Sequence, residues 1–106
     1  MIKAVFFKKS GVFTGFSVTG HAGFAESGKD IVCASVSSAV QLTVNGITEC
    51  AHIEAKVIVL ENDVALTLPD GLNSQSAQLL LNAFYLQFTL LKEEFPQFIT
   101  ITVSEV

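Results

Sequence analysis

The sequence predicts an α+β fold in which two helices pack on one face of a β-sheet, in the order ββαββαβ. Two long segments carry apolar residues at the three- and four-residue spacing of helices. Shorter segments rich in β-branched and aromatic residues surround them and are typical of strands. No linker, repeat or low-complexity segment interrupts the 106 residues, so residues 1–106 are expected to form a single two-layer domain.

The first two strands are expected at residues 2–8 and 12–19, which are rich in Val, Phe and Thr. Residues 9–11 end in glycine and join them in the manner of a β-hairpin turn. Residues 20–30 contain three glycines and show no periodicity, so a loop is expected there.

The first helix is expected from Ile31 to Ala51. One apolar stripe runs along it, formed by Val32, Val36, Ala39, Val40, Val44 and Ile47. Asp30 is expected to be its N-cap, because a carboxylate there accepts a hydrogen bond from a backbone N–H of the first turn. The β-branched residues lower the helix propensity, so packing must hold this helix in place.

The second half of the chain repeats the order of elements. A hairpin is expected from residues 52–60 and 63–68, a turn at 69–71, a helix over 74–95 and a last strand over 97–103. The second helix has two apolar stripes, one of Ala77, Leu80, Leu81, Phe84, Phe88, Leu91 and Phe95, the other of Leu79, Ala83, Leu86 and Leu90. Because a chain of this size cannot easily bury a helix on both faces, the second stripe favours a homodimer interface.

Composition excludes several classes of protein. The chain has six Lys, no Arg and a net charge of −4, which argues against a nucleic-acid-binding protein. No apolar run is expected to approach the roughly 18 residues that cross a bilayer, and residues 1–16 lack the features of a signal peptide. Cys33 and Cys50 are too few for a disulfide framework, so both are expected to be reduced thiols of a cytoplasmic protein.

A possible catalytic pair lies around the expected start of the first helix. Cys33 follows Asp30 by three residues, where unpaired N–H groups and the helix dipole favour a thiolate. His21 follows the second strand and is a candidate base for a Cys33 nucleophile, because a strand end and the next helix start commonly lie close together. The backbone N–H groups of Cys33 and Ala34 are a candidate oxyanion hole. Asp30 either orients His21 or only caps the helix.

Other functions remain open from spacing alone. A Cys33 that is merely buried fits a non-enzymatic binding module, and an activated Cys33 that needs no base fits a thiol redox sensor. His21, Asp30, Cys33 and His52 lack the spacing of a metal site, and the glycines form no phosphate-binding pattern, so no metal or cofactor is expected. Cys50 is expected to be structural and His52 to lie on the surface.

Residues 20–37 resemble the ribosomal-processing cysteine protease family called Prp. The family pattern of G-H-A, G-x-D, V-C-A and a nearby serine stands here as Gly20-His21-Ala22, Gly28-Lys29-Asp30, Ile31-Val32-Cys33-Ala34 and Ser37. The resemblance implies a single Prp-like cysteine protease domain that works as a homodimer, with Cys33 as nucleophile and His21 as base. The implied substrate is the N-terminal extension of large-subunit ribosomal protein number twenty-seven, cleaved after an apolar, Phe-containing stretch.

The segment between the two implied catalytic residues corresponds to a mobile substrate loop in the family. Its candidate substrate-binding residues are Gly23, Phe24, Glu26 and Gly28. The net charge of −4, with Glu26 in this loop, is expected to aid the encounter with a basic peptide. The expected partners are this peptide and a second copy of the chain, with no nucleic acid and no membrane.

Overall fold

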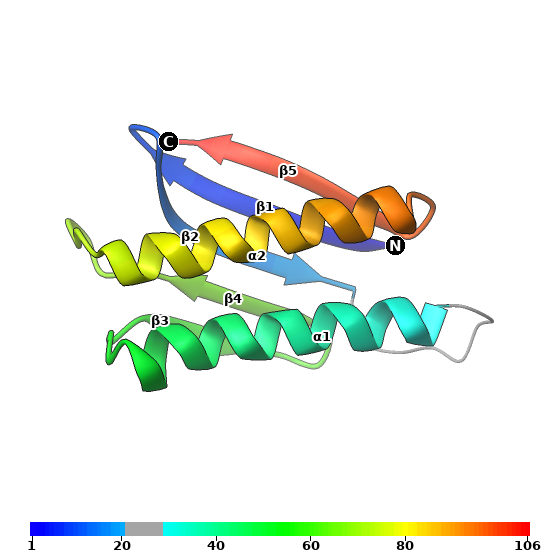
Figure 1. The fold of residues 1–106 in the computed structure, drawn as a ribbon, viewed down its shortest axis with the longest axis horizontal. Coiled ribbons are helices and arrows are strands. Elements are labelled where there is room, and N and C mark those ends of the chain that lie inside the picture. The colour runs from blue at the N-terminus through cyan, green and yellow to red at the C-terminus, as the bar shows by residue number, and fades with distance from the viewer. Residues whose placement is uncertain (21–28) are drawn as a thin grey trace.

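A computed structural model describes residues 1–20 and 29–106, with side chains for 1–20 and 31–106. One mixed sheet lies behind two long helices that cover one of its faces (Figure 1). The strands are β1 (Ile2–Lys9), β2 (Val12–Thr19), β3 (Lys56–Val59), β4 (Asp63–Thr67) and β5 (Ile99–Glu105), and the helical elements are α1 (Lys29–Asn45), the π-helical turn η1 (Gly46–Cys50) and α2 (Gln75–Glu94). The predicted α+β class and the order of elements are confirmed.

The strands of the sheet lie in the order β3-β4-β2-β1-β5. β1 and β5 are parallel, and the other neighbouring strands are antiparallel. The β1–β2 hairpin turns through Ser10 and Gly11, whose φ values of 53° and 79° are those of the tight turn that matches the twist of the strands. β3 is therefore one edge of the sheet and β5 is the other.

The core lies between the sheet and the two helices. Phe6 of β1 is its centre, with five aromatic rings at centroid distances of 5.0 to 6.5 Å, those of Phe13, Phe16, Phe84, Tyr85 and Phe88. Figure 1 shows that α1 and α2 run in opposite directions along the sheet. Each helix contributes a single buried stripe to this core.

The first helix begins earlier than predicted. α1 starts at Lys29, so Asp30 is its second residue rather than the residue before it. The prediction that Asp30 is the N-cap is therefore wrong in position, and its side chain lies outside the described part of the chain. α1 and η1 follow each other directly, so the helical segment ends at Cys50, close to the predicted Ala51.

One expectation about membranes also needs correction. The segment Ile31–Cys50 is 20 residues long with a mean hydropathy of 1.4, which is enough, by length and composition, to cross a bilayer. Length and composition do not distinguish such a span from the core helix of a soluble protein. Here 39% of the segment is buried. Val32, Val36 and Val40 pack in the core, whereas Ile31 and Leu42 are exposed.

Two other boundaries differ for local reasons. β3 begins at Lys56 rather than at His52, because His52 has a φ of 56°, which no extended strand allows. β5 continues to Glu105, two residues beyond the predicted end, because it pairs in parallel with β1 as far as Lys8. α2 follows the prediction closely, with Ser74 as an N-cap that accepts a hydrogen bond from the Ala77 N–H at 3.2 Å.

Candidate active site

Cys33 lies one helical turn after the first residue of α1 and is only 4% exposed. It belongs to the core cluster together with Val32 and Val36 of the same helix. At 100° per residue, its position falls at the edge of the buried stripe rather than at its centre. The thiol is thus held by packing on one side of α1.

The other half of the predicted dyad is not placed. His21 and the predicted substrate-loop residues Gly23, Phe24, Glu26 and Gly28 lie outside the described residues, as does the side chain of Asp30. β2 ends and α1 begins at the same end of the molecule (Figure 1), as the prediction requires. The contact between His21 and Cys33 stays a prediction.

The predicted oxyanion hole stays a prediction, and the first turn of α1 sets a condition on it. In an α-helix each N–H pairs with the carbonyl four residues earlier. The N–H groups of Cys33 and Ala34 therefore face the carbonyls of residues 29 and 30, since α1 already includes those residues. They can bind an oxyanion only if this turn opens.

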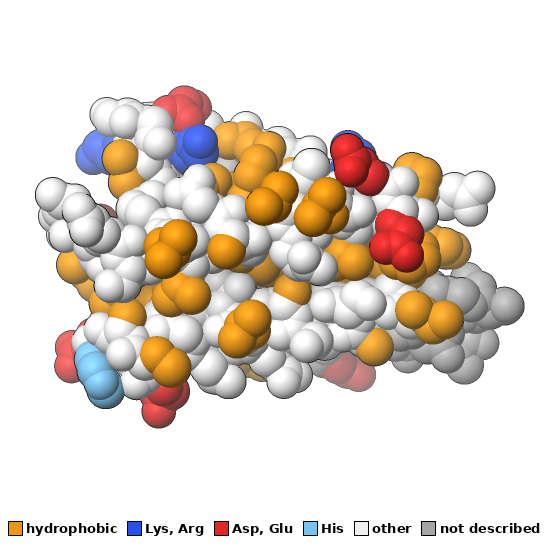
Figure 2. Space-filling model, viewed as in Figure 1, with side chains coloured by type: hydrophobic (Ala, Val, Ile, Leu, Met, Phe, Trp, Pro, Cys, Tyr) orange, Lys and Arg blue, Asp and Glu red, His pale blue; other side chains and the backbone are white. Residues whose placement is uncertain are grey.

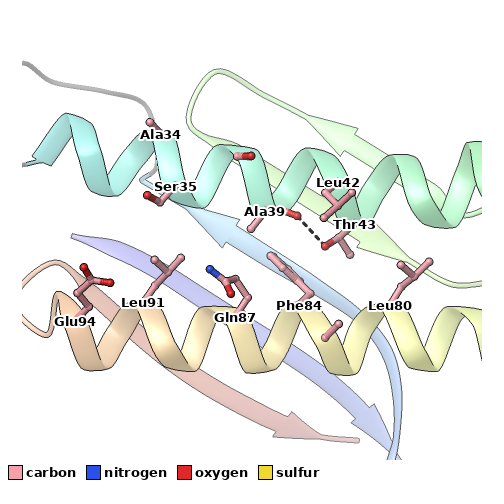
Figure 3. Close-up of a pocket in the computed structure, with 12 residues that line it drawn as sticks. Ala34, Ser35, Ala39, Leu42, Thr43, Leu80, Phe84, Gln87, Leu91 and Glu94 are labelled. Atoms are coloured by element: carbon pink, nitrogen blue, oxygen red, sulfur yellow. Dashed lines mark hydrogen bonds between the residues drawn. The ribbon is translucent and has the colours of Figure 1, made fainter.

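A groove of about 800 Å³ lies between the two helices. Figure 3 shows Ala34 and Ser35 of α1 at the end where Leu91 and Glu94 of α2 lie, with Leu80 toward the other end. Ala34, which lines one end of the groove, follows Cys33 in the sequence. The α1 residues that line the groove nevertheless lie on the opposite side of the helix from the Cys33 thiol. We therefore do not assign it to the reaction.

A second cavity, of about 300 Å³, lies on the side of α1 that carries Cys33. Its lining comes from α1, β3 and β4, and consists of Ser37, Val40, Gln41, Val44, Asn45, Val59 and Val64. The residue pattern predicted strands here but no cavity. The one sequence feature that could have indicated a cavity is the apolar run over residues 57–60. It lacks the alternation of apolar and polar residues that is typical of a strand with one face in water.

Cys50 and His52 lie apart from Cys33, at the opposite end of the helical segment. Cys50 is a free, exposed cysteine, and its assignment as structural rather than catalytic stays a prediction. His52 is exposed, as expected. Among the described side chains, those of residues 1–20 and 31–106, no group of three from His, Cys, Asp or Glu is arranged to hold a metal ion.

Comparison with known proteins decides the family. The family model described as cysteine protease Prp matches residues 1–100. The chain belongs to the Prp cysteine protease family. Membership makes it a cysteine-type peptidase, and it favours a protease over the binding module and the redox sensor. The resemblance found in residues 20–37 is confirmed and extends over most of the chain.

Relatives of known sequence and structure agree with this assignment. The ribosomal processing cysteine protease Prp of Bacillus subtilis (strain 168) is 30% identical over 94 residues, which are 84% of each chain. SMU.848 from Streptococcus mutans superposes with a TM-score of 0.93 at 33% identity, over 100% of this chain and 96% of that one. Prp from S. aureus, solved with a covalently linked product peptide, gives a TM-score of 0.87 at 25% identity, over 98% of this chain and 100% of that one.

Proposed function

We propose that this protein is an endopeptidase that removes the N-terminal extension of large-subunit ribosomal protein number twenty-seven. The family match over residues 1–100 is the observation that carries the proposal. The curated relative from Bacillus subtilis is named as a ribosomal processing protease, which supports a ribosomal protein as the substrate. An apolar stretch that contains Phe precedes the cleaved bond in the proposed substrate.

Cys33 is the nucleophile of the proposed reaction and His21 is the base. The Cys33 thiol gives its proton to His21, and the sulfur attacks the scissile carbonyl carbon to form a tetrahedral intermediate. His21 then returns the proton to the leaving amine as the C–N bond breaks, which leaves a thioester. Water adds to the thioester with the help of His21 and releases the acid and the thiol. In this proposal Asp30 either orients His21 or acts only at the start of the helix.

The burial of Cys33 adds a condition to this mechanism. At 4% exposure, the Cys33 residue presents little surface to an approaching peptide carbonyl. A productive complex therefore has to uncover the thiol. Opening of the first turn of α1 would serve this purpose and would also free the N–H groups of Cys33 and Ala34 for the oxyanion.

We infer that the protein acts as a homodimer. Leu79, Leu86 and Leu90 of α2 are 72%, 59% and 48% exposed, and they form the second stripe of that helix. Figure 2 shows apolar side chains along both helices on the face turned away from the sheet. A second copy that covers this face would remove the stripe from water, at a gain of about 25 cal/mol for each Å² of apolar surface buried.

A cytoplasmic location fits this assignment. Cys33 and Cys50 are both free cysteines, which suits a reducing compartment. The proposed substrate is a ribosomal protein, and the ribosome is assembled in that compartment in bacteria.

The test uses a synthetic peptide that spans the extension and the residues after it, with the products identified by mass spectrometry. We expect cleavage at a single bond, and a loss of about 10³-fold or more in Cys33→Ala and in His21→Ala. Cys50→Ala is the matched control, because it removes the other thiol of the same helical segment, and it should cleave at the parent rate. Retained cleavage in either of the first two variants contradicts the dyad, provided that all variants melt as the parent does.

A further inference from the structure

An exposed apolar edge of the sheet lies on the Cys33 side of the molecule. β3 is the last strand in the sheet order, and in the described part of the chain no strand pairs with its outer side. Ile58, Val59 and Leu60 are 44%, 68% and 59% exposed. Proteins usually protect such an edge with charges or cover it, because it invites other strands to pair with it. Its presence here points to an incoming strand.

The hydrogen-bond pattern shows which backbone groups of this edge are available. Leu60 and Asp63 exchange two hydrogen bonds, of 2.8 and 3.4 Å, at the β3–β4 turn. Bonded and non-bonded pairs alternate along an antiparallel ladder. The N–H and C=O groups of Val57 and Val59 therefore point away from β4, toward the open side of β3.

The same edge borders a cavity that the Cys33 side of α1 also lines. Val59 contributes to this cavity, together with Ser37, Val40 and Val44 of α1. These three helix residues follow Cys33 by four, seven and eleven positions, so they share one side of the helix with it. Ser37 lies about 6 Å along the helix axis from Cys33.

We propose that β3 and this cavity form the site where the substrate peptide binds, as an added strand beside β3. The inference rests on the proposed peptidase function and specifies how the substrate is held. The peptide backbone pairs with Val57 and Val59, and an apolar side chain enters the cavity beside Val40. The cavity begins at Ser37, one helical turn from Cys33 on the same side of α1, which favours the substrate as occupant.

This geometry predicts that the site selects the side chain at every second residue of the substrate peptide. A peptide residue opposite Val59 places its side chain on the same face as that of Val59, over the cavity. The next peptide residue points to the other face of the sheet, away from the helices. Apolar residues should therefore be needed at positions i and i+2 of the peptide, while a charge at i+1 is tolerated.

Binding of a fluorescein-labelled peptide that spans the extension, measured by fluorescence anisotropy, tests the proposal. The Cys33→Ala chain serves as the background, so that cleavage does not interfere. Val59→Asp should raise the Kd at least about tenfold, which corresponds to about 1.4 kcal/mol. Ile58→Asp is the matched control on the neighbouring residue, whose side chain points to the other face. It should change the Kd less than about twofold, because an exposed charge there is screened by water.

A scan of the peptide itself avoids any problem with folding of the variants. Each residue before the cleaved bond is replaced by Asp in turn, and the Kd should rise at alternate positions only. Equal effects at all positions, or equal effects of Val59→Asp and Ile58→Asp, would overturn the inference. So would a lack of binding to the Cys33→Ala chain by a peptide that the parent cleaves.

Two results separate this inference from the proposed function. If the parent binds the peptide with the alternating preference but does not cleave it, the peptidase assignment to this substrate fails and the binding site stands. If Val59→Asp cleaves with the parent kcat/KM while Cys33→Ala is inactive, the function stands and the binding site is refuted. If Val59→Asp only dissociates a dimer and leaves the Kd unchanged, a second copy covers this edge and the inference is wrong.

Discussion

A methyl group added at Gly15 should weaken the pairing of β2 with β4, the strand that borders the cavity beside α1. An ideal Cβ at Gly15 would overlap the backbone oxygen of Leu66 and lie 3.2 Å from the Cα of Thr67. Both atoms belong to the backbone from β4, so no side-chain rotation relieves the overlap. β3 and β4 join the sheet through the β2–β4 pairing. The strands must therefore separate where Gly15 pairs with Thr67.

The cost can be worked out from these contacts. Separation weakens about two hydrogen bonds, each with a net contribution of about 1 kcal/mol. Overpacking adds about 1 kcal/mol or more, so Gly15→Ala should lower the free energy of unfolding by about 3 kcal/mol. For a domain of this size, that corresponds to a fall in Tm of about 12–24 °C. The assay is thermal unfolding followed by far-UV circular dichroism.

Gly46→Ala is the matched control, because it adds the same methyl group. Its Cβ would lie 3.1 and 3.2 Å from the two methyl groups of Leu80, at the end of a side chain that can rotate. The gain in helix propensity, about 0.5–1 kcal/mol, offsets the crowding, so Tm should shift by less than about 5 °C. A Gly15→Ala chain that melts within the same range as the parent, or a Gly46→Ala chain that falls as far, would refute the steric reasoning.

Three further predictions concern assembly, thiol reactivity and stability. Leu86→Glu should convert the dimer into a monomer of 11.4 kDa, as measured by multi-angle light scattering. Equal masses for Leu86→Glu and the parent chain would contradict the dimer proposal. Without peptide, Ellman's reagent should modify the exposed Cys50 at least about tenfold faster than the buried Cys33, as measured in the two single-cysteine variants; equal rates would mean that Cys33 is open in the free protein. Gln78→Ala should cost about 2 kcal/mol in urea unfolding, because its side chain makes hydrogen bonds of 3.0 and 2.7 Å to the backbone of Phe13; a loss below about 0.5 kcal/mol shows that water replaces them.

Periodicity predicted the helices well because each has one stripe that the sheet buries. In α2, Leu81, Phe84 and Phe88 are buried at helical spacing, and Ser74 caps the helix as its residue type suggests. Position 52 was harder to predict, since a left-handed backbone at a histidine leaves no mark in hydropathy. The predicted start of α1 was two residues late, because Asp is favourable both in the first turn of a helix and at its N-cap.

The candidate site was only partly accessible from the residues. Cys33 was identified through the sequence pattern around it. Its burial depends on the rotation of α1 about its axis, and the hydropathy pattern predicts that rotation only to within one residue position. The cavity beside α1 was not found at all. It brings together Val40 and Val59, and their proximity follows from the order β3-β4-β2 of the strands, which the spacing of apolar residues does not encode.

The most direct test of the central claim is to identify the thiol that a substrate-like reagent modifies. A peptidyl chloromethyl ketone that carries the apolar residues of the extension is incubated with the protein, and the modified residue is mapped by mass spectrometry. Simple exposure favours Cys50, because Cys33 is buried. A cysteine peptidase that uses Cys33 should take up one equivalent at Cys33, with Cys50 left free and the rate reduced in His21→Ala. Modification of Cys50 alone, or equal modification of both thiols, would contradict the assignment of Cys33 as the nucleophile.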